Sequence, residues 1–194
     1  MVKTSYALDE KRQDNPTCHY ILRDLFNEEE LDYLAKKARS AQEQASIGEG
    51  TINNSIRRTK INWVSPDKTK LWIFKRLETY VERINKEIFN FELSSISAIQ
   101  LANYKSEEKG KYDWHLDCGK GPIRKLSIAI QLNDPSEYEG GEFCFMTGSD
   151  ETKLPKEKGL AVLFPSFLLH RVAPVTSGER QSLVCWVQGT RPFS

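Results

Sequence analysis

Three residues of this chain have the types and the spacing of a metal site. His115 and Asp117 are separated by one residue, and His170 follows far downstream. Side chains two positions apart on an extended segment point to the same face, so the first two can bind one ion. Two imidazoles and one carboxylate form the facial triad, which binds Fe(II) and leaves coordination positions open. An HxD pair alone arises often by chance, but two of the chain's three histidines belong to this set.

His170 has an alternative interpretation. It follows the apolar sequence GLAVLFPSFLL, in which residues 160–164 have the pattern of a fully buried strand. A lone histidine after such a strand is more often a hydrogen-bonded core residue than a ligand. The preceding HxD pair and an arginine ten residues further on favour the ligand interpretation.

Arg180 adds a second kind of site. It opens a predicted strand in which Arg180, Ser182, Val184 and Trp186 share one face. A buried charge is costly unless it is paired, and a guanidinium pairs bidentately with a carboxylate. The pattern therefore predicts that Arg180 binds a dicarboxylate cosubstrate. The alternative is an arginine at the strand mouth that pairs with a surface Asp or Glu.

Two helices are expected in the first half of the chain, where they must support the strands that carry these residues. The first is predicted to begin at Asn27, whose side chain can cap the helix, with Glu30 completing a capping box. The second is predicted to have Ser65 as its N-cap and Pro66 at its first position. Both have an apolar face at helical spacing, formed by Leu31, Leu34, Ala35 and Ala38 in the first and by Leu71, Phe74, Leu77, Val81, Ile84 and Ile88 in the second.

Short alternating runs separated by turn residues predict a mainly β structure with flanking helices. The predicted strands cover residues 58–64, 95–104, 114–117, 125–132, 142–146, 159–164, 170–172 and 180–188. Many short strands with frequent turns indicate a sandwich or jelly roll rather than a βαβ fold. We expect one domain over residues 1–194, with helical support over about 1–94 and a β core over about 95–190.

Composition and charge limit the classes of function. Lys and Arg number 28 against 27 Asp and Glu, a formal net charge of +1, so charge gives nucleic acid binding no support. The first residues lack the order of a signal peptide, and no apolar run has the length of a membrane span. The cysteines, which form no CxxC pair, are Cys18, Cys118, Cys144 and Cys185. We therefore expect reduced thiols, a cytoplasmic location and no membrane contact.

Taken in order, the motifs of the C-terminal half resemble those of one enzyme family. The set comprises Tyr104, Gly110, the HLD motif at 115–117, the Gly140–Gly141 pair, GLAVLFP at 159–165, HRVAPVTSGER at 170–180, and Trp186. This set is similar to that of the prolyl 4-hydroxylase-like branch of the Fe(II)/2-oxoglutarate-dependent dioxygenase superfamily. The resemblance covers about residues 98–188, and the helical half is similar to this branch in layout only.

The resemblance implies a double-stranded β-helix, or jelly-roll, core packed against the N-terminal helices. It also implies that His115, Asp117 and His170 are the catalytic Fe(II) ligands, with 2-oxoglutarate and O2 as cosubstrates and ascorbate as an accessory reductant. In this chemistry 2-oxoglutarate is decarboxylated to succinate and CO2 while an unactivated C–H bond is hydroxylated. The carboxylate of Asp117 favours hydroxylation over halogenation, because halogenating relatives lack it.

Five residues are expected around the cosubstrate. The resemblance implies that Arg180 binds the distal carboxylate of 2-oxoglutarate and that Tyr104 donates a hydrogen bond to it. Phe143 is expected to line the pocket and Trp186 to pack at its back wall, although strand cores favour aromatic residues in any case. Gln131 stands where some relatives have a second tyrosine, and its amide is a candidate replacement for that phenol as a donor.

A prolyl residue in a peptide or protein is the substrate that the resemblance favours. Arg57 and Arg58 are expected to bind it, because segment 54–63 matches a substrate-groove region of relatives. Free amino acids, other side chains and alkylated nucleic acid fit the same chemistry. The nucleic acid branch, however, carries a second arginine six residues past Arg180, where this chain has Trp186. The last alternative is a catalytically inactive β-barrel binding module, against which the intact triad and Arg180 argue.

Overall fold

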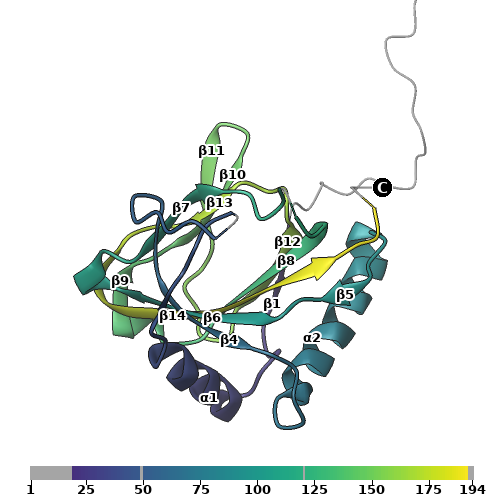
Figure 1. The fold of residues 1–194 in the computed structure, drawn as a ribbon, viewed down its shortest axis with the longest axis horizontal. Coiled ribbons are helices and arrows are strands. Elements are labelled where there is room, and N and C mark those ends of the chain that lie inside the picture. Colours follow the sequence, from purple (N-terminus) through teal and green to yellow (C-terminus); the bar gives the residue numbers. More distant parts are fainter. Residues whose placement is uncertain (1–18, 49, 120, 192–194) are drawn as a thin grey trace, which may run out of the picture.

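Two antiparallel β-sheets face each other in the structure, a computed structural model that describes residues 19–48, 50–119 and 121–191 (Figure 1). The larger sheet has the order β1 (Tyr20–Leu22), β12 (Ala161–Pro165), β8 (Arg124–Gln131), β14 (Val175–Gln188), β6 (Ile99–Lys105), β4 (Lys60–Val64) and β2 (Glu43–Gln44), and β14 also pairs with β5 (Ser95–Ile96) and β9 (Tyr138–Gly140). The smaller sheet has the order β11 (Asp150–Lys153), β10 (Phe143–Thr147), β13 (His170–Val172), β7 (Lys111–His115) and β3 (Arg57–Arg58). This arrangement confirms the predicted mainly β jelly roll.

Helices α1 (Glu28–Arg39) and α2 (Leu71–Ile84) cover the outer side of the larger sheet, away from the smaller one (Figure 1). A π-helical turn (Asn85–Phe89) extends α2, and two 3-10 turns (Ser106–Glu108 and Pro135–Glu137) lie between strands. The buried core between helices and sheet includes Leu34, Leu77 and Ile84 from the helices and Leu126, Ile128, Ile130, Leu183 and Cys185 from the sheet. Each fully buried aliphatic side chain contributes roughly 1.5–3 kcal/mol. The helices therefore fix the larger sheet from outside and leave its inner face for the site.

The start of α1 agrees with the prediction in detail. The Asn27 side chain accepts a hydrogen bond from the Glu30 backbone N–H, and the Glu30 carboxylate accepts one from the Asn27 backbone N–H. This reciprocal capping box satisfies two helix N–H groups that have no partner within the helix. The buried face consists of Leu31, Leu34, Ala35 and Ala38, as predicted.

The start of α2 was predicted wrongly. Ser65 and Pro66 precede the helix, and the N-cap is Lys70. The carboxylate of Asp67 accepts hydrogen bonds from the backbone N–H groups of Thr69 (2.8 Å) and Lys70 (3.2 Å). This local turn occupies the residues that the prediction assigned to the first helical turn, because Asp side chains compete with helical backbone hydrogen bonds.

The buried face of α2 differs from the apolar stripe that the sequence predicts. Leu71 is exposed at the start of the helix, and Ile88 lies in the π-helical turn and is half-buried. The buried face consists of Ile73, Phe74, Leu77, Tyr80, Val81 and Ile84. Ile73 and Tyr80 thus belong to the core in addition to the predicted stripe, Leu71 does not, and Ile88 packs against the core.

Two predicted strands are divided between different partners. Segment 58–64 is not one strand: β3 pairs with β7 in the smaller sheet, β4 pairs with β6 in the larger one, and Thr59 joins them. Segment 95–104 is likewise split into β5 and β6. Strands β9 and β11 occupy segments with the composition of turns. Hydrogen bonding to distant strands decides these boundaries, which local composition does not report.

Strand β14 carries the site on one face and the outer core on the other. It begins at Val175, five residues earlier than predicted, and it passes through Gly178 with φ +67°. Arg180, Ser182, Val184 and Trp186 line a cavity between the two sheets, whereas Leu183, Cys185 and Val187 pack under the helices. The predicted two-residue alternation is therefore confirmed.

No helix in the described ranges is long and apolar enough to cross a membrane. Cys118, Cys144 and Cys185 carry free thiols, as expected, and Cys18 lies outside the described residues.

Candidate active site

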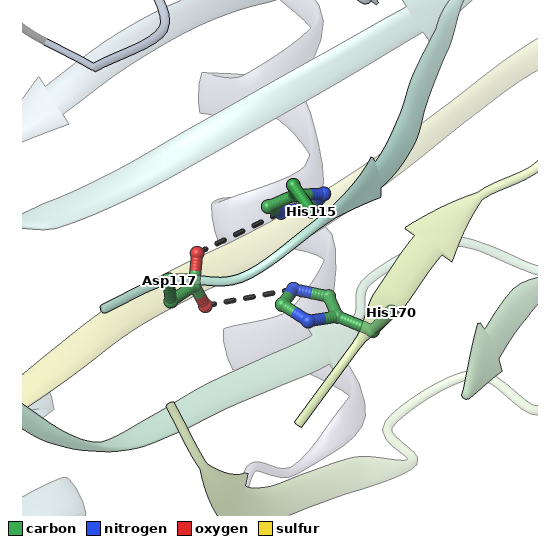
Figure 2. A group of neighbouring side chains, drawn as sticks. All are labelled: His115, Asp117 and His170. Carbon is green, nitrogen blue, oxygen red and sulfur yellow. Dashed lines mark ion pairs between the residues drawn. The ribbon is translucent and has the colours of Figure 1, made fainter. Parts of the chain in front are cut away.

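The three predicted metal ligands converge between the two sheets. His115 ends β7 and His170 opens β13, and these two residues are direct partners in the ladder that joins the strands. Asp117 Oδ1 lies 3.6 Å from His115 Nε2, and Asp117 Oδ2 lies 3.5 Å from His170 Nε2 (Figure 2). One ligand atom from each residue lies within 4.8 Å of the others, a spacing that can hold a metal ion.

Asp117 reaches this position from a turn and not from a strand. Strand β7 ends at His115, so the predicted extended segment 114–117 is wrong at its end. The backbone N–H groups of Asp117 and Cys118 donate to the carbonyl oxygen of Ser166, at 2.9 and 3.2 Å. The loop after β7 is thereby tied to the end of β12, and this tie orients the carboxylate toward the two imidazoles.

Both imidazoles are held with Nε2 toward the centre. The His115 Nδ1 atom lies 2.7 Å from the carbonyl oxygen of Asp113, and His170 Nδ1 lies 2.8 Å from that of Leu168. A carbonyl oxygen only accepts, so each Nδ1 carries the proton and each Nε2 lone pair is available to a metal. Burial, assisted by the neighbouring His170, lowers the pKa of His115 to about 3, which keeps this ring neutral at physiological pH.

The carboxylate of Asp117 is ionised although its side chain is only 6% exposed. Burial alone would raise its pKa, but the imidazoles of His170 and His115 lower the pKa below its usual value. Its Oδ2 atom has no hydrogen-bond partner among the described residues. A buried carboxylate oxygen without a partner is costly. A cation between the two imidazoles would remove that cost.

Aromatic rings wall off the triad from water. The Tyr112 ring stacks on His115 with centroids 3.4 Å apart. On the other histidine, the centroid of Phe164 lies 4.8 Å and that of Phe143 5.5 Å from His170. Apolar walls of this kind strengthen electrostatic interactions at the centre, because they exclude the solvent that would screen them.

The guanidinium of Arg180 lines the same cavity as the triad. Arg180 on β14 is the direct partner of Tyr104 on β6, and its Cζ atom lies 5.4 Å from the Tyr104 ring centroid. The side chain is buried, and its Nε and Nη1 atoms have no hydrogen-bond partner within the described ranges. Arg180 is only 4% exposed, which does not fit the alternative of an arginine at the strand mouth that pairs with a surface Asp or Glu. The donors are available to an anion in the cavity.

Comparison with known proteins places this arrangement in a family. The sequence model of the 2OG-Fe(II) oxygenase superfamily, where 2OG is 2-oxoglutarate, matches residues 99–188. A PKHD-type hydroxylase of Prochlorococcus marinus (strain NATL1A) is 30% identical over 175 residues, which cover 87% of this chain and 77% of the relative. The chain belongs to the 2OG-Fe(II) oxygenase superfamily. A PKHD-type hydroxylase of Psychrobacter sp. is 48% identical over 93 residues, which cover 47% of this chain and 36% of that relative.

Solved structures show the same fold. A prolyl-4-hydroxylase of Pseudomonas putida has a TM-score of 0.73 and 21% identity, over 88% of this chain and 92% of that one. A prolyl hydroxylase of Trichoplax adhaerens, in complex with a hypoxia inducible factor peptide fragment, has a TM-score of 0.76 and 16% identity, over 88% and 83% of the two chains. The cofactors of the 2OG-Fe(II) oxygenases, Fe(II), 2-oxoglutarate and O2, therefore apply to this chain. Its residues fit them, since Asp117 Oδ2 and two nitrogen atoms of Arg180, all without a hydrogen-bond partner among the described residues, belong to side chains that line one cavity.

The other expected cosubstrate residues are only partly brought together in this oxygenase. Tyr104, Phe143 and Trp186 line the cavity with Arg180. Gln131 is buried nearby, but its amide Nε2 donates to the backbone carbonyl oxygen (3.3 Å) and to the side-chain oxygen (3.2 Å) of Asn133. The amide that was expected to replace a phenol is therefore already engaged.

The side chains of the two arginines that were expected to bind the substrate lie in different surroundings. Arg57 is buried and lines the cavity, where it lies over the Tyr112 ring at 4.4 Å and donates to Gln100 Oε1 at 2.6 Å. Arg58 points elsewhere, and its Nε atom donates to the carbonyl oxygen of Asn54 at 2.7 Å. Adjacent strand residues face opposite sides, so only one of the pair can reach the site.

Sequence reasoning missed Tyr112 and Arg124. Period-two alternation would place Tyr112 on the face opposite His115, but the pairing of β7 with β13 shifts register between them and brings the two rings together. Arg124 opens β8, lies over the Trp186 ring at 4.0 Å, and donates to the Asp117 carbonyl oxygen at 3.2 Å. Arg124 could have been selected from the sequence, because it is an arginine at the start of an apolar strand, seven residues after the HxD pair.

Proposed function

We propose that this oxygenase hydroxylates a prolyl residue in a peptide or protein, with His115, Asp117 and His170 as the Fe(II) ligands. The observation that carries the proposal is that one cavity is lined by two buried side chains with atoms that lack a hydrogen-bond partner among the described residues, Asp117 through Oδ2 and Arg180 through Nε and Nη1. When bound, Fe(II), 2-oxoglutarate and O2 supply an oxidative decarboxylation that yields succinate and CO2 and places one oxygen atom into a C–H bond.

The protein's own groups then bind, orient and exclude water. His115, Asp117 and His170 would hold the ion through one donor atom each, and a triad of this type would leave further coordination positions to the cosubstrates. Arg180 binds the distal carboxylate of 2-oxoglutarate bidentately, and the Tyr104 phenol adds a donor from the neighbouring strand. Phe143 and Trp186 enclose the cosubstrate between these groups.

A groove outside the triad supports a peptide substrate. It has a volume of about 480 Å³ and begins at Asp117. Two exposed apolar side chains, Trp63 and Leu116, lie in its lining, together with the guanidinium groups of Arg57 and Arg124. Exposed apolar groups beside fixed donors suit an extended peptide, whose carbonyl oxygens need donors and whose side chains need apolar contact.

The relatives support the prolyl substrate. The Trichoplax prolyl hydroxylase of similar fold is in complex with a peptide, and the Pseudomonas relative is a prolyl-4-hydroxylase. A net charge of +1 gives alkylated nucleic acid as the substrate no support. Buried free thiols at Cys144 and Cys185 support a reducing compartment such as the cytoplasm.

The first test is an anaerobic titration of the apo-protein with Fe(II) and 2-oxoglutarate, followed by the visible charge-transfer band of the bound 2-oxo acid. We expect a band in the wild type, none in His170→Ala, and an unchanged band in His19→Ala, which removes the one histidine outside the triad. Bound iron without a band would contradict the cosubstrate role.

The substrate is tested separately with a library of proline-containing peptides, O2 and ascorbate. We expect succinate release together with a peptide that gains one oxygen atom on proline. A product oxidised on another residue, or on a free amino acid, would keep the enzyme class and reject the prolyl substrate.

A further inference from the structure

A small cavity beside the cosubstrate cavity is lined by Tyr138, a tyrosine that the sequence analysis did not select. Gln131, which occupies the position of a second tyrosine in some relatives, directs its amide to Asn133. We propose that the Tyr138 hydroxyl takes over this role and donates a hydrogen bond to the distal carboxylate of 2-oxoglutarate, beside Arg180. This inference rests on the proposed function and assigns a further cosubstrate-binding residue to the same site.

Tyr138 lies against Arg180 on the side away from Tyr104's strand. Its strand, β9, pairs with the first residues of β14, where Tyr138 is opposite Gly178. Tyr138, Gln131 and Arg180 together line a small cavity that shares Ala129, Phe143 and Arg180 with the cavity of the triad. Arg180 therefore borders both cavities, one lined by Tyr104 and the other by Tyr138.

The Tyr138 hydroxyl is a hydrogen-bond donor that has no acceptor among the described residues. The residue is 4% exposed, and its oxygen has no hydrogen-bond partner among the described residues. Burial raises the pKa of this phenol, although the charge of Arg180 opposes the shift, so the hydroxyl keeps its proton at physiological pH. A buried hydroxyl without a partner is destabilising. Two such groups side by side, a phenol and a guanidinium, together match the several lone pairs of one carboxylate.

The ring of Tyr138 is held in this orientation from two sides. A Cβ atom added at Gly141 would lie 2.9 Å from Arg180 Cδ and 3.3 Å from Tyr138 Cε2, so only glycine lets the two side chains approach each other here. On the other side, the Lys156 Nζ atom lies 4.6 Å from the centroid of the Tyr138 ring and donates to the Gly140 carbonyl oxygen at 3.1 Å. Gly141 therefore permits the packing of the phenol against the Arg180 side chain.

The test measures binding rather than turnover. Fe(II)-loaded protein is titrated under argon with 2-oxoglutarate and, separately, with pyruvate, a 2-oxo acid that lacks the distal carboxylate. For Tyr138→Phe we expect the dissociation constant for 2-oxoglutarate to rise about tenfold or more, the effect of one hydrogen bond to a charged group. The dissociation constant for pyruvate should be unchanged, since pyruvate has no group at the distal end of the cavity.

Two further variants make the result specific. Tyr80→Phe removes another buried hydroxyl without a partner, on α2 and far from the cavity, and should leave both dissociation constants unchanged. Gln131→Met should likewise leave the binding of 2-oxoglutarate unchanged, because its amide serves Asn133. Equal losses for 2-oxoglutarate and pyruvate in Tyr138→Phe would indicate a general packing role and overturn the inference.

The remaining outcomes separate this inference from the proposed function. A Tyr138→Phe variant that binds 2-oxoglutarate like the wild type, or a loss found in Gln131→Met instead, overturns the role of Tyr138 alone. A wild type that gives no band with 2-oxoglutarate overturns the proposed function and this inference with it.

Discussion

The imidazole of His115 and the phenol ring of Tyr112 stack with their centroids 3.4 Å apart and their planes at 14°. The Arg57 guanidinium lies over the same Tyr112 ring, 4.4 Å from its centroid. A candidate metal ligand is thereby linked through one aromatic ring to a cation of the proposed substrate groove. The contact fixes the plane of His115, and it gives Arg57 a defined position at the mouth of the cavity.

Replacing Arg180 should have opposite effects on the stability of the apo-protein and on its affinity for 2-oxoglutarate. The buried guanidinium has two nitrogen atoms without partners, and a buried charge without a partner destabilises the folded state. We expect Arg180→Leu to raise the melting temperature of the apo-protein and to weaken 2-oxoglutarate binding roughly 100-fold, the loss of about two charged hydrogen bonds. Thermal unfolding with and without 2-oxoglutarate checks both effects. A melting temperature below that of the wild type would show that the apo-protein satisfies this charge internally.

Arg57 and Arg58 offer a matched pair for the substrate groove. Arg57 lines the groove and Arg58 does not, although the two are adjacent in the chain. We expect Arg57→Ala to lower kcat/KM for the peptide about tenfold, within the range for a buried contact residue at an interface. Arg58→Ala should have little effect. The dissociation constant for 2-oxoglutarate should be unchanged in both, and equal kinetic effects of the two substitutions would contradict the placement of Arg57.

Alanine substitutions at Gly141 and Gly148 distinguish the effect of backbone strain from the effect of a contact with Arg180. Both have positive φ, +65° and +72°, so an alanine at either position costs about 1–2 kcal/mol of backbone strain. A Cβ at Gly148 would meet nothing within 4 Å, whereas one at Gly141 would press on Arg180. We expect both variants to lose stability in urea unfolding, but only Gly141→Ala to bind 2-oxoglutarate more weakly. Equal binding by the two variants would show that Arg180 moves aside without consequence.

The buried thiols should be unreactive at mildly alkaline pH. Burial raises the pKa of Cys144 and of Cys185 to about 12. Because the thiolate is the reactive form, only about 1 in 10⁴ of these groups is reactive at about pH 8. Brief exposure of the native protein to iodoacetamide should leave both unmodified and should label the half-buried Cys118 before either of them. Mass spectrometry of peptides checks this, with urea-unfolded protein as the control in which all four cysteines react.

Local patterns in the sequence determined the parts of this protein that depend on near neighbours. The capping box of Asn27 and Glu30 is complete within four residues, so its prediction needs no tertiary information. The inward face of β14, with Arg180 and Trp186, follows from the two-residue period of any strand. The ordered motifs from Tyr104 to Trp186 likewise indicated the oxygenase family, which the comparisons confirm.

Tertiary structure decided what depends on partners far along the chain. The division of segment 58–64 at Thr59 follows the two sheets to which its halves pair. The register shift that brings Tyr112 onto His115 exists only in the pairing of β7 with β13. Hydrogen bonds between strands distant in sequence set these positions, and the composition of a short segment does not encode which partner or register it meets.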